Sequence, residues 1–305
     1  MKPLFSIILS SFNSSEKLGR SIASVLSQTL HDFELIVVDD GSTDDTRKII
    51  QEYSVLDRRI RVLVNHKNIG LTRSLNAALK LASGEVIARI DAGDSWLQNK
   101  LGCQMSLWLR IKDLCVLGTQ ADMVDENGGL LRKTSLPIED CDIRKYLLRG
   151  LNPFIHSSVM FKKGLGYTQH YPCAQDVDLW RRMYKSGRFL NTTEALLKCE
   201  LNRKSISYQK RACQVYYGYD SYQRFVSANY AIHGPRFLCG VSLSVLWSKV
   251  FGRLYASAIS VRGNFGRLLV ILVYLSYPRI FAVKILYMLL VRKVLSDSKI
   301  DCEMR

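Results

Sequence analysis

Two aspartates follow an apolar run in the stretch IARIDAGDSW (87–96). Carboxylates at the end of a buried strand are costly unless they bind something. A divalent metal bound with a nucleotide diphosphate needs only one or two protein carboxylates, because phosphate oxygens and water supply the other ligands. Asp91 and Asp94 therefore predict a metal and diphosphate site, where Gly93 would let the backbone approach a phosphate closely. An ordinary acidic turn is the alternative.

A second acidic stretch, VVDDGSTDDT (37–46), also follows an apolar run. Asp39 and Asp40 at a strand end could accept hydrogen bonds from a pyrimidine N–H or from ribose hydroxyls. The helix that follows would add the positive end of its dipole. An Asx turn with a helix cap is the structural alternative.

A third acid, Asp176, lies in AQDVDLWRRM (174–183), near the start of a predicted helix whose apolar side carries Leu179. A carboxylate that follows nucleotide and metal elements could serve as the general base for an attacking hydroxyl. For Asp176 and Asp178 alike, a favourable charge in the first helical turn is the alternative.

These acids need elements that bring them together, and residues 3–91 alternate strand and helix patterns. The runs 3–11 and 33–40 are continuous and rich in β-branched residues, which is typical of strands buried on both faces. We expect strands over 3–11, 33–40, 60–65 and 85–91, and helices over 14–28, about 43–54 and 70–82. Helices between successive strands predict a parallel, doubly wound α/β sheet.

Polar residues fall at one edge of this predicted sheet. Ser11 and Asn13 follow the first strand, and the acidic stretches follow the second and fourth. Arg73 lies in the first turns of helix 70–82, whose start should face the same edge. Ligands of such sheets bind outside the carboxyl ends of the strands. The pattern therefore predicts a ligand site along this edge.

A second α+β segment follows, and the chain then becomes helical. We expect strands near 114–118, 157–162 and 193–199, a helix near 175–186, and helices from about residue 208 to the end. This predicts two domains, a catalytic α/β domain over 1–207 and a helical C-terminal region over 208–305.

The C-terminal region is both basic and apolar. The net charge is +16, and residues 201–305 contain 16 Lys and Arg against 4 Asp and Glu, which is +12 of that total. Together these properties predict an anionic membrane surface as partner rather than nucleic acid. Residues 268–291 are long enough to span a bilayer, but Arg279 and Lys284 interrupt them. Because such charges are costly, we favour helices on the cytoplasmic leaflet over a span.

The cysteines and the N-terminus give two smaller expectations. Eight Cys are scattered without a CxxC pair, which predicts reduced thiols in a cytosolic protein rather than a disulfide framework. The sequence MKPLFSIILSSFNSSE lacks a small-residue cleavage site, so it predicts a first strand rather than a signal peptide.

Taken in order, six motifs resemble those of inverting family 2 glycosyltransferases with the GT-A fold. The resemblance covers about residues 4–207, and the ordered set is far more specific than any one motif. The motifs are SIILSSFN, ELIVVDDGSTDDT, NIGLTRSLNAAL, ARIDAGD, NPFIHSSVMF and QDVDLWRRM.

The resemblance implies roles for individual residues. Ser11 and Asn13 would line the nucleotide pocket. Asp40, together with Asp39, would recognise the nucleobase. Arg73 would contact the nucleotide. The remaining implied roles are ribose and metal binding for Asp91 and Asp94, general base for Asp176, and contacts with the donor or acceptor sugar for His156.

Three positions depart from the family pattern. Gly93 stands where an acid is usual, so the middle metal carboxylate is missing. Gln175 replaces the Glu that precedes the base, which would weaken acceptor orientation. The segment LNRKSIS (201–207) stands where many relatives have a His near the diphosphate, and Arg203 or Lys204 could supply a cation there.

The implied activity is transfer of a sugar from a nucleotide-diphosphate sugar, most readily UDP-linked, with Mn²⁺ or Mg²⁺ on the diphosphate. The acceptor would be a hydroxyl of a saccharide or lipid-linked saccharide in cell-surface polysaccharide synthesis, at the cytoplasmic face of the membrane. A nucleotidyltransferase would need a Gly-rich loop after the first strand, and an oxidoreductase would need GxGxxG there. The residues at that place, SSFNSSE, contain no Gly, which argues against both classes. A catalytically impaired relative that binds membranes is the non-enzymatic alternative.

Overall fold

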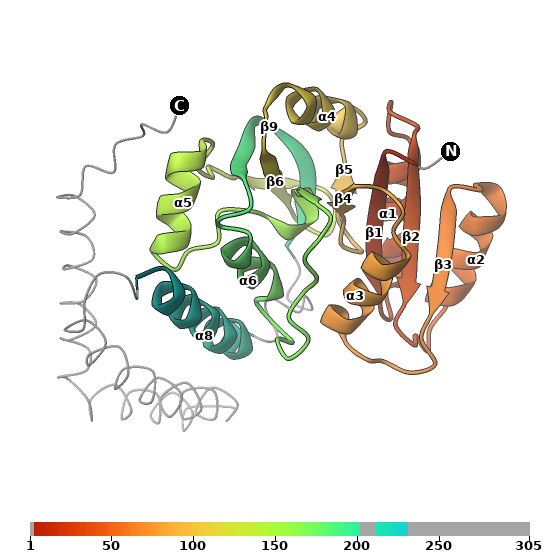
Figure 1. Ribbon diagram of the computed structural model, residues 1–305. Helices are drawn as coiled ribbons and strands as arrows, with labels where there is room; N and C mark the ends of the chain where they lie inside the picture. The colour runs from red at the N-terminus through yellow and green to blue at the C-terminus, as the bar shows by residue number, and fades with distance from the viewer. Residues whose placement is uncertain (1–2, 202–210, 231–305) are drawn as a thin grey trace. The chain divides into compact units, whose positions relative to one another are not determined.

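The computed structural model describes residues 3–201 and 211–230 (Figure 1). Apart from Tyr230, these residues belong to one compact unit, which ends at Asn229. Arg203 and residues 268–291 lie outside the described residues, so the predictions for them stay predictions. In the described part, no helix is both long and apolar enough to cross a membrane.

The described strands form one mixed sheet. Its order is β3-β2-β1-β4-β8-β6-β9-β5, with β7 paired to β6. The strands are β1 (Phe5–Ser11), β2 (Phe33–Asp39), β3 (Ile60–Val64), β4 (Val86–Arg89), β5 (Ser95–Trp96), β6 (Leu114–Val124), β7 (Leu130–Lys133), β8 (Met160–Lys162) and β9 (Arg188–Glu200).

Helices alternate with these strands along the chain. They are α1 (Ser15–Leu26), α2 (Thr46–Leu56), α3 (Leu71–Leu81), α4 (Lys100–Arg110), α5 (Asp140–Leu148), the short 3₁₀ helix η1 (His156–Ser158), α6 (Gln175–Arg182) and α8 (Arg211–Tyr230).

Strands β3, β2, β1 and β4 run parallel, as the sequence predicts. They stand together on one side of Figure 1 with α1, α2 and α3 around them. β8 pairs antiparallel with both β4 and β6, whereas β6 and β9 are again parallel. The predicted doubly wound, mostly parallel α/β sheet is therefore confirmed.

Two apolar layers cover the two faces of the sheet. Ile8 and Val38 point into a layer shared with α3, α5 and α6. Leu9 and Val37, their neighbours in sequence, point into a layer shared with α1, α2 and α4. Successive side chains of a strand point to opposite faces, so these continuous apolar runs serve both layers. This explains why the strands lack polar alternation.

The structure adds elements that the sequence patterns did not indicate. α4 and α5 fall between the predicted strands, and β7 forms a hairpin with β6. All four residues of β7 are exposed, so the strand carries no buried face for an apolar pattern to mark. β9 begins at Arg188, earlier than predicted, because its first residues pair with β6.

α8 confirms helical structure directly after residue 210, and it is part of the compact unit that contains the sheet. The predicted domain boundary at 207 falls among undescribed residues, so that division stays a prediction. The six described cysteines are free thiols, and the expectation of a reduced, cytosolic protein stays a prediction. They are Cys103, Cys115, Cys141, Cys173, Cys199 and Cys213.

Candidate active site

The carboxyl ends of β1 and β2 are joined where the nucleotide-binding residues are expected. Ser11 lies opposite Asp39 in the parallel register, and its carbonyl oxygen accepts the N–H of Asp40 at 2.8 Å. The Ser11 side chain is buried, and its Oγ has no hydrogen-bond partner among the described residues. A buried hydroxyl without a partner is costly, so this group is available to a ligand.

Asn13 links the two loops that follow β1 and β2. Its backbone is left-handed, with φ of 48°, a conformation that Asn adopts more readily than most residues. Its Oδ1 accepts the N–H of Thr43 at 2.9 Å, and its own N–H donates to Ser42 Oγ at 3.0 Å. The Asn13 side chain therefore holds the pocket loops together.

Asp39 is buried and bound within its own loop. Its Oδ1 accepts the N–H of Ser42 at 2.9 Å, and its Oδ2 pairs with Arg47 Nε at 3.0 Å. This is the turn-forming role that the sequence left open as an alternative. Asp39 thus shapes the start of α2.

Asp40 braces the segment before α3. Its Oδ1 accepts the N–H of Ile69 and its Oδ2 that of Gly70, each at 2.9 Å. Gly41 permits this close approach, because a Cβ there would lie 2.5 Å from the carbonyl carbon of Lys67. Asn65 Nδ2 also donates to Asp40 Oδ1 at 2.9 Å. A carboxylate oxygen has two lone pairs, so Asp40 keeps acceptor capacity for a ligand at Oδ2.

Arg73 lies in the first turn of α3, after Gly70, which caps the helix with φ of 90°. The Arg73 side chain is exposed. Among residues 3–201 and 211–230, no hydrogen-bond or ion-pair partner is assigned to its guanidinium. Its free charge near the loop held by Asp40 suits an anionic ligand.

Asp91 is held in place by a buried cation two residues earlier in the chain. Arg89, fully buried, forms an ion pair with Asp91 Oδ1. Burial acts to raise the pKa of Asp91, but the charges of Arg89 and His156 and the hydrogen bond from Arg89 together hold that pKa below its usual value. The N–H of Asp91 donates to Ser157 Oγ at 2.7 Å. Asp91 is therefore a fixed carboxylate.

Asp94 lies on the same turn, but its pKa is shifted in the opposite direction. Its Oδ1 accepts the N–H of Glu200 at 3.0 Å. Burial, and then the charge of Asp91, raise the pKa of Asp94 from 3.8 to about 7, against the lowering effect of the Ser157 hydrogen bond. A cation at this position would relieve the repulsion between the two carboxylates.

Gly93 makes the turn between the two acids. Its φ of 105° is a conformation that side chains rarely adopt. Its carbonyl accepts Arg20 Nη2 at 2.8 Å. Arg20 and Lys17 both form ion pairs with Glu200. Gly93, which departs from the family pattern, thus stands where the backbone conformation favours glycine. Two cations of α1, Lys17 and Arg20, lie beside the same turn.

The carboxylates present fit a divalent metal held jointly with a diphosphate. Asp94 faces repulsion that a cation removes, and Asp91 lies beside it. No group of three or more His, Cys, Asp or Glu side chains suited to a metal occurs within residues 3–201 and 211–230. A shared site of this kind needs only one or two protein carboxylates.

Asp176 lies in the first turn of α6. The preceding residue but one, Ala174, is the N-cap and has a left-handed backbone, with φ of 57°. Asp176 is partly exposed, and its Oδ2 accepts Asn152 Nδ2 at 2.7 Å. Oδ1 has no hydrogen bond assigned among the described residues. A carboxylate held at one oxygen and open at the other is suited to accept a proton.

His156 connects the two acidic parts of the site. Its Nε2 shares a hydrogen bond of 2.8 Å with the hydroxyl of Tyr167. Burial, and then the charge of Arg89, lower the pKa of His156 from 6.5 to about 4, although Asp176 and Asp91 oppose this. His156 is therefore neutral at pH 7. The charges of Asp91 and Asp176 both act on this ring.

Gln175 and Asp178 flank the candidate base and differ in role. Gln175 is buried, and its Oε1 has no hydrogen-bond partner among the described residues. Asp178 is buried and bound to Thr168 Oγ1 at 2.6 Å and to Arg182 Nε at 2.8 Å. Asp178 is thus structural, which leaves Asp176 as the carboxylate of α6 with an open oxygen.

Sequence reasoning missed Arg89, Asn152 and Ser157, although all three lie in or beside the motifs that it used. Arg89 interrupts an apolar strand, which is a signal of a buried charge with a partner. Asn152 and Ser157 gave no such signal, because their partners are distant in the sequence and meet them only in the fold.

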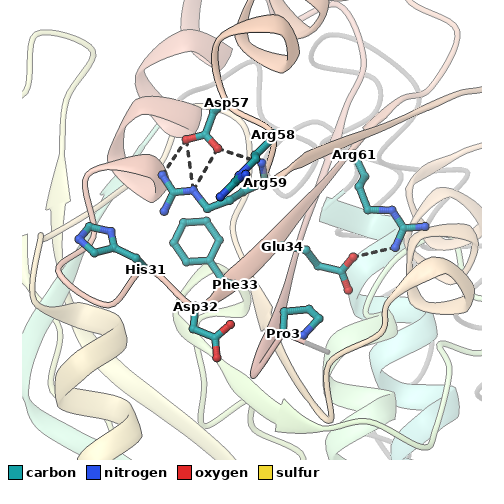
Figure 2. A pocket seen from close by; sticks show the side chains of 9 residues that line it. All are labelled: Pro3, His31, Asp32, Phe33, Glu34, Asp57, Arg58, Arg59 and Arg61. Carbon is teal, nitrogen blue, oxygen red and sulfur yellow. Dashed lines mark hydrogen bonds and ion pairs between the residues drawn. The ribbon is translucent and has the colours of Figure 1, made fainter. Parts of the chain in front are cut away.

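Figure 2 shows an open groove of about 730 Å³. It is lined by residues at the start of β2 and β3, the opposite ends from the acidic edge. Arg59 pairs there with Asp57 at 2.7 Å, and Arg61 pairs with Glu34 at 2.7 Å. Because these charges neutralise one another, we place the functional site at the carboxyl edge instead.

Residues 6–164 match the family described as Glycosyl transferase family 2. An O-antigen biosynthesis glycosyltransferase of Escherichia coli is 32% identical over 222 residues, covering 70% of this chain and 85% of that protein. The chain belongs to glycosyl transferase family 2 and is a glycosyltransferase.

Another relative, whose name states its donor and acceptor, matches a shorter stretch of this chain. A UDP-Glc:α-D-GlcNAc-diphosphoundecaprenol β-1,3-glucosyltransferase of Escherichia coli is 45% identical over 107 residues. The match covers 35% of this chain and 42% of that protein.

Solved structures support the fold. S. aureus TarS in complex with UDP superposes with a TM-score of 0.58 at 17% identity, covering 88% of each chain. A mannosyltransferase from Pyrobaculum calidifontis in complex with GDP-Man and Mn²⁺ has a TM-score of 0.55 at 15% identity, covering 96% of this chain and 87% of that one. At these identities the likeness concerns the fold alone.

Proposed function

We propose that the chain transfers a sugar from a UDP-linked donor to a hydroxyl acceptor with inversion at the anomeric carbon. The observation that carries this proposal is the state of Asp176, whose Oδ2 is bound by Asn152 while Oδ1 stays open. Inversion by direct displacement needs a single base, because no covalent intermediate forms. Asp176 takes the proton of the acceptor hydroxyl as that oxygen attacks.

The donor lies along the ends of β1, β2 and β4. The unpartnered Oγ of Ser11 binds the nucleotide, Asn13 and Asp39 hold its loops in place, and Asp40 accepts from the base. Arg73 contacts the nucleotide phosphates, and Asp91 accepts a hydrogen bond from the ribose. UDP fits this proposal because the 45% identical relative uses UDP-Glc.

Asp94, with Asp91 beside it, holds a divalent ion, Mn²⁺ or Mg²⁺. The bound ion supplies charge neutralisation for the leaving diphosphate. Arg20 and Lys17 on α1 add positive charge beside the same turn. His156 is neutral, so it can share a hydrogen bond with a sugar hydroxyl without adding charge. Gln175 Oε1 accepts a hydrogen bond from the acceptor.

The acceptor is a saccharide, and a lipid-linked one suits the basic C-terminal region. The 45% identical relative is named for a diphosphoundecaprenol-linked acceptor, and the 32% identical one for O-antigen biosynthesis. We place the enzyme in cell-surface polysaccharide synthesis, bound peripherally at the cytoplasmic face of the membrane. Carbonate extraction of membranes tests this placement. Release supports peripheral binding, and retention contradicts it.

A UDP-release screen tests the function. Purified full-length protein is mixed with Mn²⁺, a panel of UDP- and GDP-sugars and a membrane lipid extract. We expect UDP release from one donor, dependent on the extract. Asp176→Asn should bind UDP like the wild type and lose transfer. Asp142→Asn, an exposed aspartate of α5, is the matched control and should stay active. Substantial turnover by Asp176→Asn would refute the base assignment.

A further inference from the structure

Helix α8 lies against the segment that carries Asp176. The rings of Tyr217 and Tyr171 lie 5.4 Å apart at this contact. Four hydrogen bonds join α8 to residues 171–181: Ala174 N–H to Gln214 Oε1 at 2.9 Å, Tyr171 Oη to Asp220 Oδ2 at 2.7 Å, Ser221 Oγ to Asp178 Oδ1 at 3.1 Å, and Arg181 Nη1 to the Gly218 carbonyl at 2.8 Å.

The bond from Ala174 has a specific position in the site. Ala174 is the N-cap of α6, and the first N–H groups of a helix have no partner within the helix. An Ala side chain cannot cap them. The chain between β8 and α6, residues 163–174, contains no helix or strand, and side chains of α3 hold its earlier part: Thr72 Oγ1 donates to the Tyr171 carbonyl at 2.6 Å, and the Asn76 amide bonds the backbone N–H and carbonyl of Tyr167 at 2.8 Å each. Gln214 holds the N–H of Ala174, the last residue before α6 and two residues before Asp176.

We infer that Gln214 is a positioning residue for the candidate base and that α8 is part of the catalytic unit. This rests on the proposed role of Asp176. Loss of the Gln214 bond frees the left-handed Ala174 to relax, and a displacement of α6 moves the carboxylate away from the acceptor hydroxyl. α8 lies beyond residues 6–164, where the family match ends, so the match does not assign this contact.

Three variants of the full-length protein test the inference. Gln214→Met keeps the length and helix preference of the side chain but removes the oxygen. Gln214→Glu keeps an oxygen acceptor. Val215→Ala, at a neighbouring side chain that is 55% exposed, is the matched control. Each is measured by amide hydrogen exchange over residues 171–178, by UDP affinity with Mn²⁺, and by turnover of the donor found in the screen.

We expect Gln214→Met to exchange faster over 171–178 and to lose about tenfold in kcat, because small misplacements of a catalytic group are costly. UDP affinity should not change, and Gln214→Glu should restore both exchange and kcat. Unchanged exchange, unchanged kcat or an equal loss of UDP affinity in Gln214→Met would overturn the inference. Turnover by Asp176→Asn instead rejects the base assignment, whereas hydrogen exchange still reports on the α8 contact.

Discussion

Asn152 Nδ2 donates a hydrogen bond to Asp176 Oδ2 across 2.7 Å. The orientation of the Asn152 amide is set by a second bond, because its Oδ1 accepts the N–H of Phe154 at 3.3 Å. Phe154 is buried against Trp180 of α6. The Asn152 amide thus presents its nitrogen to the aspartate.

We predict that Asn152→Ala lowers kcat by about tenfold or more, because a hydrogen bond to a charged group contributes about 1.5–3 kcal/mol. UDP affinity should be retained, since the Asn152 side chain bonds Asp176 and Phe154 and none of the residues proposed to bind UDP. Asn152→Asp should be slower still, because the new carboxylate repels Asp176. Kinetics and UDP titration check this, and an Asn152→Asp variant as active as the wild type contradicts it.

Ser157 ties the acidic turn to η1. It is buried, accepts the N–H of Asp91 at 2.7 Å, and hydrogen-bonds the carboxylate of Asp94. Ser157→Ala leaves these groups unpaired, so we predict about tenfold weaker UDP binding in the presence of Mn²⁺. Isothermal titration measures this. Ser106→Ala, at an exposed serine of α4, is the control, and equal affinities for the two variants would contradict the prediction.

Metal binding should depend on pH through Asp94. The pKa of Asp94 is raised to about 7 by burial and by Asp91. Below pH 7 the metal must displace a proton, so Mn²⁺ affinity should fall by up to about tenfold per pH unit and level off above pH 7. Titration of Mn²⁺ with UDP from pH 5.5 to 8.5, as assay conditions, checks this. Asp94→Asn should bind weakly and without this pH dependence. A flat wild-type profile, or chelator-resistant transfer, excludes Asp94 as a ligand.

Glu34 should stabilise the fold in a pH-dependent way. Burial acts to raise its pKa, but hydrogen bonds from Ser6, Arg61 and Ser83 lower it from 4.5 to about 2. A depressed carboxyl pKa adds stability that is full above pH 4.5 and is lost as pH falls toward 2. We predict that Glu34→Gln is about 2 kcal/mol less stable at pH 7.

The difference in stability between Glu34→Gln and the wild type should shrink below pH 4.5, which urea unfolding across this range measures. The groove beside Glu34 lies away from the active site, so donor turnover of this variant should match that of the wild type at temperatures where both are folded. A stability difference that stays constant down to pH 2 would rule out this linkage.

The parallel half of the fold could be predicted in detail. Short apolar segments separated by helical periods predict β1, β2, β3 and β4, because each element is marked by its own residues. β3, at the edge of the sheet, is the one of these that is mostly exposed, and the pattern does not predict its exposure. The second half was less predictable. β7 has no buried face, and β9 depends on its pairing with β6. Such pairings join residues far apart in the sequence, and no local pattern records them.

The same division holds for the site. The sequence by itself determined the family, the sheet and the acids at its carboxyl edge, because motif order and strand ends are local properties. Only the tertiary structure decided how those acids differ. Arg89 pairs with Asp91, whereas Asp94 stays repelled, and Asp178 is bound while Asp176 keeps an open oxygen. Charge state and orientation depend on burial and on partners brought from other elements, and these exist only in the folded chain.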